Sequence, residues 1–367
     1  MNFVISMDLH RWGYSCLAEN RQPPDGVARQ LLGQGHKFIH VDMDSYFVAV
    51  ELLDAPWLRE RPVAVGGKAT DRGVISTSNY IARRYGVRSG MATATAERLC
   101  PGLVLLPVRF ERYEAVTRRL DVIFRRYTSN VEFLSLDEAT LDVTGQVYCN
   151  GSATYMANRI RASIEQKLHL TASAGVAPLK YLAKMASEVN KPNGQFVIAP
   201  HQVQAFLKNL DIRKIPGVGP KTWAVLQALG CTKCADVTDE MIPALLRHLG
   251  AHGFYVWERC RGQESYEGKP GAVQSLGVEH TLPSDCNDFA CCLRELDELL
   301  GTLAKRLEVL GSAPPIVRNQ VKLKFSDFSI ATAEAPALAL QPQVVRGLCR
   351  MPVSYTHLTL PTTTLCR

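Results

Sequence analysis

The stretch KFIHVDMDSYF, residues 37–47, decides the fold because it changes from strand to helix at a pair of aspartates. Alternation puts the apolar residues at 39, 41 and 43 on one face and Asp42 and Asp44 on the other. Two carboxylates one residue apart can hold a hard divalent cation. Asp and Ser before an apolar run are also common helix caps. The stretch thus indicates a buried strand that ends at either a metal site or a helix cap.

A second acidic stretch, VEFLSLDEATLDV at residues 131–143, carries Asp137 and Glu138 side by side. Neighbouring side chains of a straight strand point to opposite faces, so the chain must bend for both to face one ion. We therefore predict a hairpin with this pair near its tip, although exposed hairpin tips often carry acids for no functional reason. Asp42, Asp137 and Glu138 together would repel unless cations neutralised them. Carboxylates that hold two Mg²⁺ ions are the usual machinery of in-line phosphoryl transfer.

The composition is that of a globular protein with several domains. The chain has 367 residues, of which 46% are hydrophobic and 21% charged, and this length suits two to four domains. A net charge of +7 and a pI of about 8.8 suit a polyanionic partner without requiring one. No apolar run approaches the roughly 18 residues that a membrane span needs, so we expect no membrane partner.

The 11 cysteines are scattered and odd in number, which is not the pattern of a disulfide framework. A cytoplasmic location therefore fits better than a secreted one. Cys231 and Cys234 form a single CxxC without a second pair at zinc spacing, so we predict no zinc site there.

Five stretches, in this order, resemble the Y-family of translesion DNA polymerases, and the match runs from about His36 to about Phe328. They are HVDMDSYFVAVE (40–51), GVISTSNYIARRYGVRSGM (73–91), SLDEATLDVTG (135–145), LTASAGVAPLKYLAKMASEVNKPNGQF (170–196) and KIPGVG (214–219). The resemblance implies an α+β, multidomain, right-hand polymerase whose antiparallel palm sheet has helices on one face. Its expected parts are a palm (36–44 and 108–199), small fingers (45–107), a helical thumb (200–264), a linker (265–274) and an incomplete α/β little finger (275–350).

The resemblance also assigns roles at the active site. Asp42, Asp137 and Glu138, together with the Met43 carbonyl, would hold two Mg²⁺. Phe47 would be a steric gate that excludes the ribose 2′-hydroxyl by a clash, although core packing is the usual role of such a residue. The remaining expected contacts to the incoming dNTP come from Tyr46, Tyr80, Arg83 and Lys191.

One of these assignments also has local support from helix geometry. Tyr80 and Arg83 lie three residues apart and so share a helix face. A phenol and a guanidinium on one face suit a triphosphate tail.

Two segments are predicted to grip primer–template DNA. KIPGVGPKTWAVLQALG fits a helix-hairpin-helix in which Gly217 and Gly219 let backbone N–H groups approach a phosphate, with Lys221 beside them. IVRNQVKLKF alternates, with Val317, Val321, Leu323 and Phe325 expected on one face. Arg318, Lys322 and Lys324 are expected on the other face, which suits a DNA groove or plain solvent.

Both ends of the chain depart from the resemblance. Residues 1–35 are expected outside the fold, either as a flexible arm or as the product of a wrongly chosen start codon. Residues 351–367 have an abrupt Thr/Leu/Pro bias and look foreign. The last strands and the clamp-binding peptide of the family are not visible, so we expect an unpaired sheet edge and weak binding to the sliding clamp.

The sequence therefore predicts a monomeric, low-fidelity, template-directed DNA polymerase for translesion synthesis that adds dNMP from dNTP to a primer 3′-hydroxyl. The short fingers, about sixty residues, offer little to enclose and test a nascent base pair. Two alternatives stay open at this point: another two-metal phosphoryl-transfer enzyme on a palm-like fold, and a non-catalytic helix-hairpin-helix DNA-binding protein.

Overall fold

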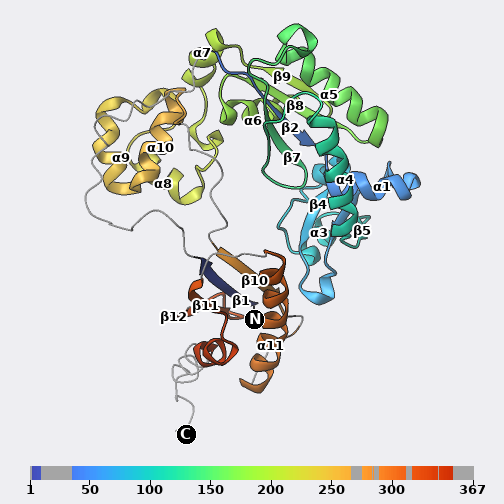
Figure 1. Ribbon diagram of the computed structural model, residues 1–367, viewed down its shortest axis with the longest axis vertical. Helices are drawn as coiled ribbons and strands as arrows, with labels where there is room; N and C mark the ends of the chain where they lie inside the picture. Colours follow the sequence, from blue (N-terminus) through green and yellow to red (C-terminus); the bar gives the residue numbers. More distant parts are fainter. Residues whose placement is uncertain are drawn as a thin grey trace.

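A computed structural model describes residues 2–9, 35–265, 275–282, 284, 289–310, 316–337 and 339–349. Within this part of the chain the strands form three sheets, and helices pack around and between them (Figure 1). The predicted linker and the foreign-looking tail lie almost wholly outside the described residues. No described helix has both the length and the apolar character that a bilayer crossing demands.

The five-stranded sheet has the order β6-β7-β2-β8-β9, and the three-stranded sheet has the order β4-β3-β5. The strands of these two sheets are β2 (Phe38–Met43), β3 (Val63–Gly66), β4 (Ile75–Ser78), β5 (Val104–Leu106), β6 (Val131–Phe133), β7 (Glu138–Asp142), β8 (Ala172–Ala177) and β9 (Gln195–Val197). The helices around them are α1 (Tyr46–Asp54), α2 (Tyr80–Arg84), α3 (Thr93–Leu99), α4 (Phe110–Phe124), α5 (Ala153–Leu168) and α6 (Lys180–Val189).

Strand β2 lies at the centre of the five-stranded sheet, antiparallel to both β7 and β8. Its residues Ile39, Val41 and Met43 pack into one core with side chains of α4 and α5, as the alternation predicted. Helix α6 packs against β2 and β8 from the opposite face, where Phe38 joins its core. The sequence placed helices on one face only, and the additional cover by α6 matters because α6 carries lysines toward the acids.

The contact between α6 and β8 depends on Gly175. A Cβ added at this position would lie 1.9 Å from the carbonyl oxygen of Ala183 and 2.4 Å from the amide nitrogen of Ser187, both on α6. The small side chains of β8 therefore allow the backbone of α6 to approach this strand closely.

The thumb region is helical, as predicted. Its helices are α7 (Val203–Lys208), α8 (Pro220–Ala228), α9 (Ile242–Leu249) and α10 (Ala251–Cys260). Cys231 and Cys234 are free thiols buried in its core.

The third sheet has four strands in the order β10-β1-β11-β12, with helix α11 against it (Figure 1). Its elements are β1 (Asn2–Leu9), β10 (Ser275–Thr281), α11 (Phe289–Val309), β11 (Ile316–Lys324) and β12 (Ile330–Pro336). The prediction that residues 1–35 lie outside the fold is wrong for residues 2–9, because they form an inner strand of this sheet. Of the rest of that segment, only residue 35 is among the described residues.

The predicted alternation along β11 holds except at its start. Val321 and Leu323 are buried, but Val317 is 40% exposed and Ile316 is buried instead. The pairing between β1 and β11 shifts register at this end, where Leu9 pairs with Ile316 and position 317 is skipped. An irregularity of this kind reverses which side chains face the core.

We predict that Gly175→Ala destabilises the protein, because the new methyl group must displace the backbone of α6. Overpacking of this kind typically costs about 1–3 kcal/mol or more, measured as the free energy of unfolding in urea. Gly102→Ala is the matched control, since the nearest atom to its added Cβ is 4.0 Å away. Equal stability of the two variants would contradict the packing described here.

Candidate active site

Asp42 and Glu138 meet because of the pairing between β2 and β7, in which they are direct register partners. The Met43 amide continues this pairing by donating a 2.9 Å hydrogen bond to the carbonyl of Asp137. Ligand atoms of His40, Asp42 and Glu138 all lie within 4.8 Å of one another. The two acidic stretches, far apart in sequence, therefore converge at one end of the sheet, and the sequence did not single out His40.

Each of the two paired acids has a lysine partner. Lys191 Nζ lies 2.8 Å from Asp42 Oδ2, and Lys184 Nζ, from α6, lies 2.5 Å from Glu138 Oε2. Lys191 is also held by Glu188. Lys191 was predicted as a phosphate contact and Lys184 was not, because the position of α6 on the acidic face was not foreseen.

The environment separates the acid strengths of the two carboxylates. Burial raises the pKa of Asp42 to about 7, against the opposing pull of Lys191. His40 and Lys184 hold the pKa of Glu138 at about 2. Burial lowers the pKa of His40, which favours the neutral imidazole. Glu138 thus stays charged at neutral pH, whereas the pKa of Asp42 lies close to neutral pH.

Asp44 does not join this cluster. Its buried carboxylate accepts hydrogen bonds from Ser173 Oγ at 2.9 Å, from the Asn193 amide at 2.8 Å and from Tyr80 Oη at 3.3 Å. Neither the metal role nor the helix-cap role considered for Asp44 therefore applies. It ties the fingers helix α2 to the sheet and to the loop that holds Lys191.

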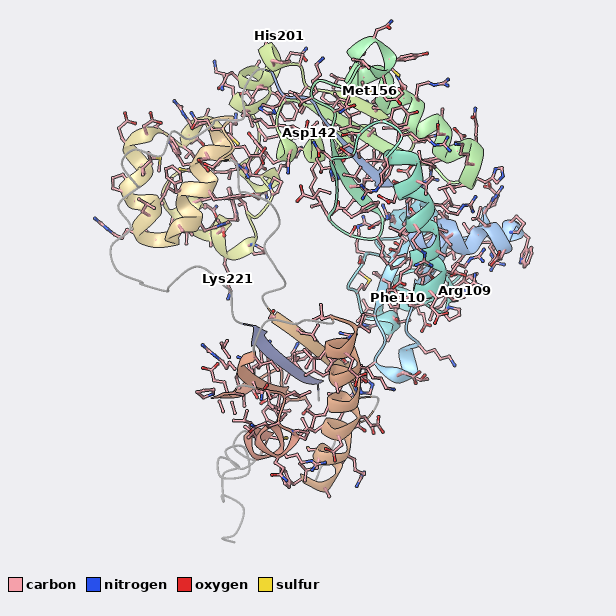
Figure 2. The ribbon with its side chains drawn as sticks, viewed as in Figure 1. Arg109, Phe110, Asp142, Met156, His201 and Lys221 are labelled. Carbon is pink, nitrogen blue, oxygen red and sulfur yellow. The ribbon has the colours of Figure 1, made fainter. Side chains whose placement is uncertain are left out.

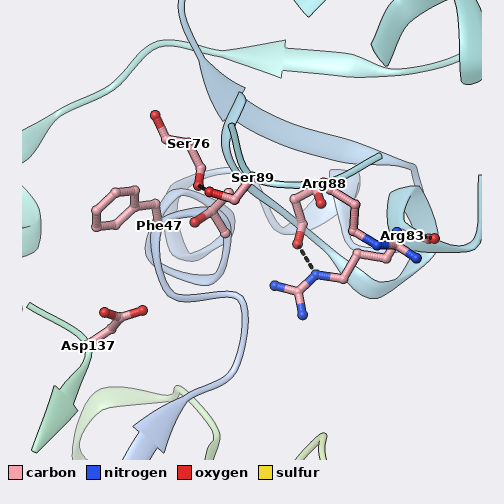
Figure 3. A pocket seen from close by; sticks show the side chains of 8 residues that line it. Phe47, Ser76, Arg83, Arg88, Ser89 and Asp137 are labelled. Atoms are coloured by element: carbon pink, nitrogen blue, oxygen red, sulfur yellow. Dashed lines mark hydrogen bonds between the residues drawn. The ribbon is translucent and has the colours of Figure 1, made fainter. Parts of the chain in front are cut away.

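Asp137 lies on the wall of a pocket of about 560 Å³ that opens between the sheet and the fingers (Figure 3). The other residues that line this pocket are Phe47, Ser76, Thr77, Ser78, Arg83, Arg88 and Ser89. The sequence singled out Phe47, Arg83 and Asp137 for the site. It missed the serines and threonine because nothing in their local pattern distinguishes them from ordinary strand residues.

The Phe47 ring is held in place by other aromatic rings. It stacks on Tyr113 at 4.2 Å between centroids with planes 10° apart, and it meets Phe110 edge-on at 6.0 Å. Tyr113 Oη in turn donates a 2.7 Å hydrogen bond to buried Glu51, which also binds Arg109. Figure 2 labels Arg109 and Phe110 at this end of α4. The wall formed by Phe47 is therefore rigid.

The remaining predicted nucleotide contacts lie in different surroundings. Arg83 stacks on the Tyr80 ring at 4.8 Å and donates to the Ser78 carbonyl at 3.0 Å, so the predicted pair shares a helix face. Burial raises the pKa of Tyr80 to about 12. Tyr46 is fully buried and donates to the Tyr113 carbonyl at 2.8 Å, which places it in the core behind Phe47. The Met43 side chain is also buried.

The predicted phosphate-binding hairpin is exposed at Gly217, Gly219 and Lys221, and Figure 2 labels Lys221 at the start of α8. Gly217 has a φ of +91°, a conformation that favours glycine. A second helical turn braces this hairpin, since His252 hydrogen bonds to the Gly217 carbonyl at 3.1 Å and Tyr255 to the Pro216 carbonyl at 3.2 Å.

The predicted DNA-binding residues of β11 differ in how far their positive charges are engaged by neighbouring side chains. Arg318 is paired with Glu334 of β12 at 2.9 Å. Lys324 lies 4.7 Å above the ring of Phe328, and Lys322 is half-buried.

Comparison with family models gives three matches along the chain. Residues 41–188 match the impB/mucB/samB family, residues 201–230 match the IMS family HHH motif, and residues 273–345 match the impB/mucB/samB family C-terminal domain.

Curated relatives and solved structures agree with these matches. The chain is 52% identical over 299 residues to DNA polymerase IV of Pectobacterium atrosepticum and 51% identical to that of Yersinia pestis, covering 81% of this chain and 85% of each relative. A Y-family DNA polymerase chimera is similar in structure, with a TM-score of 0.79 and 28% identity over 88% of this chain and 95% of its own. An insertion ternary complex of Dbh DNA polymerase has a TM-score of 0.60 and 28% identity, covering 87% of this chain and 94% of its own.

We predict that Asp42→Asn raises thermal stability when divalent cations are chelated, and that it does so more at about pH 8 than at about pH 5. The raised pKa means that folding opposes loss of the Asp42 proton. The protein therefore loses stability as the pH rises from about 4, the pKa of Asp42 in the unfolded chain, to about 7, its pKa in the folded protein. The asparagine removes a penalty of about 2–4 kcal/mol at the higher pH.

Thermal unfolding with a chelator at both pH values measures this effect. Asp137→Asn is the control, since this neighbouring carboxylate is partly exposed. An Asp42→Asn variant that is equally destabilised at both pH values would show that the Lys191 pair outweighs burial.

Proposed function

This chain belongs to the impB/mucB/samB family, the Y-family of translesion DNA polymerases, and from that premise we propose how its residues carry out the reaction. It is a template-directed DNA polymerase that adds nucleotides to a primer 3′-hydroxyl. The proposal is that Asp42, Asp137 and Glu138 hold two Mg²⁺ at the end of β2 and β7. The observation that carries it is the convergence of Asp42 and Glu138 across the β2–β7 pair, with Asp137 beside them.

The donor set fits a hard divalent cation. Asp42 and Glu138 offer carboxylate oxygens within 4.8 Å of each other, and oxygen ligands are those that Mg²⁺ prefers. The burial that raises the pKa of Asp42 to about 7 would be offset by a bound cation. Asp137 and the carbonyl of Met43 are the further ligands we propose. Bound ions would lower the pKa of the primer 3′-hydroxyl and neutralise charge on the triphosphate.

Three cationic or polar side chains are proposed to receive the triphosphate. Lys191 touches Asp42 at 2.8 Å, so its ammonium lies beside the place where phosphate oxygens would meet the metal site. Arg83 lines the pocket, and Tyr80 orients Arg83 through the ring stack. Positive charge fixed in advance at this position stabilises the charge that develops on the phosphates during transfer. Arg88, which also lines the pocket, adds a further guanidinium that the sequence did not assign to the site.

The lining of the pocket supports the proposal that the polymerase has low fidelity. Apart from Phe47 its fingers wall consists of serines, a threonine and two arginines, with no bulky apolar side chain to press on a base pair. Discrimination by shape needs a closed and rigid site. We propose that this open wall lets damaged templates pass, while the rigid Phe47 ring keeps selection of the sugar strict.

The proposed DNA grip combines the hairpin at Gly217 and Gly219 with Lys221 and the basic residues of β11. Backbone N–H groups and lysines contact phosphates regardless of sequence, so binding should weaken as salt rises. Arg318 contributes less than its charge suggests, because Glu334 already compensates it.

We predict that Asp42→Asn and Glu138→Gln each reduce primer extension by about 10³-fold or more, because each removes a proposed metal ligand. The assay is extension of a labelled primer with one dNTP at a time, which also tests whether the template base selects the nucleotide. Glu132→Gln is the matched control, since this acid lies on β6 of the same sheet and pairs with Lys180 at 2.6 Å. Activity retained in Glu138→Gln, or nucleotide use that ignores the template, would refute the proposal.

We predict that Phe47→Val raises ribonucleotide incorporation relative to deoxyribonucleotide incorporation by about 10- to 100-fold, because the clash with the 2′-hydroxyl is lost. The ratio of kcat/KM for the two nucleotides opposite one template base is the measurement. Phe110→Leu is the comparison: it keeps the Phe47 ring in the pocket and removes only the edge-on contact that supports it, so the ratio should rise less than in Phe47→Val. An unchanged ratio in Phe47→Val would remove Phe47 from sugar selection.

A further inference from the structure

The four-stranded sheet contains a strand from the opposite end of the chain. Strand β1 lies between β10 and β11, antiparallel to both, so β10 and β11 run parallel to each other with one strand width between them (Figure 1). Helix α11 connects β10 to β11 in sequence. Between β10 and β11 there is thus a slot one strand wide, and residues 2–9 fill it.

The pairing along this slot is long on both sides. Positions from Asn2 to Asp8 pair with Thr281 to Ser275 on β10, and positions from Asn2 to Leu9 pair with Lys324 to Ile316 on β11. An inner strand satisfies backbone groups on two neighbours at once, so its removal leaves the facing edges of both β10 and β11 unpaired. Removal of β1 should therefore destabilise the sheet more than removal of an edge strand would.

The slot also lies over the core of this domain. The register aligns positions 3 and 5 of β1 with Leu323 and Val321, which are fully buried, and position 5 also with buried Val278. The side chains of Val278, Val321 and Leu323 belong to one core with Leu296 of α11. Opening the slot would let water reach this core between β10 and β11.

The sequence of residues 2–9, NFVISMDL, suits this position, since apolar residues alternate along it with positions of mixed character. Residues 10–34 separate it from the palm, a connection that can span at most roughly 80–90 Å when extended.

We propose that the space between β10 and β11 is a strand-acceptor site whose occupant is the chain's own N-terminal segment, residues 2–9. The C-terminal domain is thus completed by strand addition, the recognition mode in which main-chain hydrogen bonds supply most of the affinity. A free peptide with the sequence of residues 1–10 is the ligand class that the emptied site accepts. One consequence rests on the proposed function: the DNA-facing residues of β11 are ordered only when the N-terminus is docked.

The test is made on the full chain, with Val4→Pro compared with Val4→Thr. Proline at an inner strand position removes a ladder hydrogen bond, whereas threonine keeps a β-branched side chain at this half-buried site. Hydrogen exchange should show about tenfold or greater loss of amide protection in β10 and β11 of Val4→Pro only. Protection in β2 of the palm should stay unchanged. Equal protection of β10 and β11 in both variants would overturn the proposal.

A fluorescein-labelled peptide of residues 1–10 provides the second measurement. It should bind saturably to the Val4→Pro chain and restore protection in β10 and β11, and it should bind far more weakly to the Val4→Thr chain, whose site is filled. The same peptide carrying Val4→Pro is the negative control. Peptide addition also decides the case in which the Val4→Pro chain loses protection throughout. Recovery at β10 and β11 then supports the proposal, and no recovery rejects it.

Neither measurement involves DNA or nucleotides, so failure here is distinguishable from failure of the proposed active site.

Discussion

The backbone pairing between β2 and β7 is the constraint on which the active site depends. It makes Asp42 and Glu138 register partners, and the hydrogen bond from the Met43 amide to the Asp137 carbonyl extends the pairing to the tip. A slip of one residue would turn one carboxylate to the other face of the sheet. The buried side chains of Ile39, Val41 and Leu141 oppose such a slip because their apolar surfaces would face the wrong side. Core packing therefore fixes the relative positions of the acids that we propose as catalytic.

The negative charges of Asp42 and Glu138 are compensated by neighbouring side chains. Two carboxylates so close together are costly to bury, and Lys191, Lys184 and His40 surround them. The compensation is uneven, so Glu138 stays ionised while burial raises the pKa of Asp42 to about 7. Because burial disfavours the charged form of Asp42, a bound cation would stabilise this site. Active sites often sacrifice stability for function in this manner.

The proposed selection of the sugar would depend on a series of contacts that begins in the core. Phe47 stacks on Tyr113, Tyr113 binds Glu51, and Glu51 binds Arg109. Helices α1 and α4 are thereby locked together behind the pocket. The opposite wall consists of serines, a threonine and two arginines, and its side chains are held by hydrogen bonds to the backbone, such as that from Ser89 to the Ser76 carbonyl at 2.8 Å. The pocket thus combines an aromatic surface at Phe47, supported by the core, with a polar wall on the opposite side.

Local patterns in the sequence were sufficient to predict the strand-to-helix change at residues 37–47, the acidic hairpin and the helical thumb, because periodicity and turn residues act over a few positions. The family was predicted from the resemblance of five stretches. The local patterns could not decide that Asp44 is a structural acceptor rather than a ligand, that His40 and Lys184 join the acids, or that Tyr46 points into the core. They also placed residues 2–9 outside the fold, although these form an inner strand. Such outcomes depend on which distant segments pair and pack. Alternation states only which face a side chain occupies, whereas hydrogen-bond register and burial between segments more than a hundred residues apart determine what that face meets.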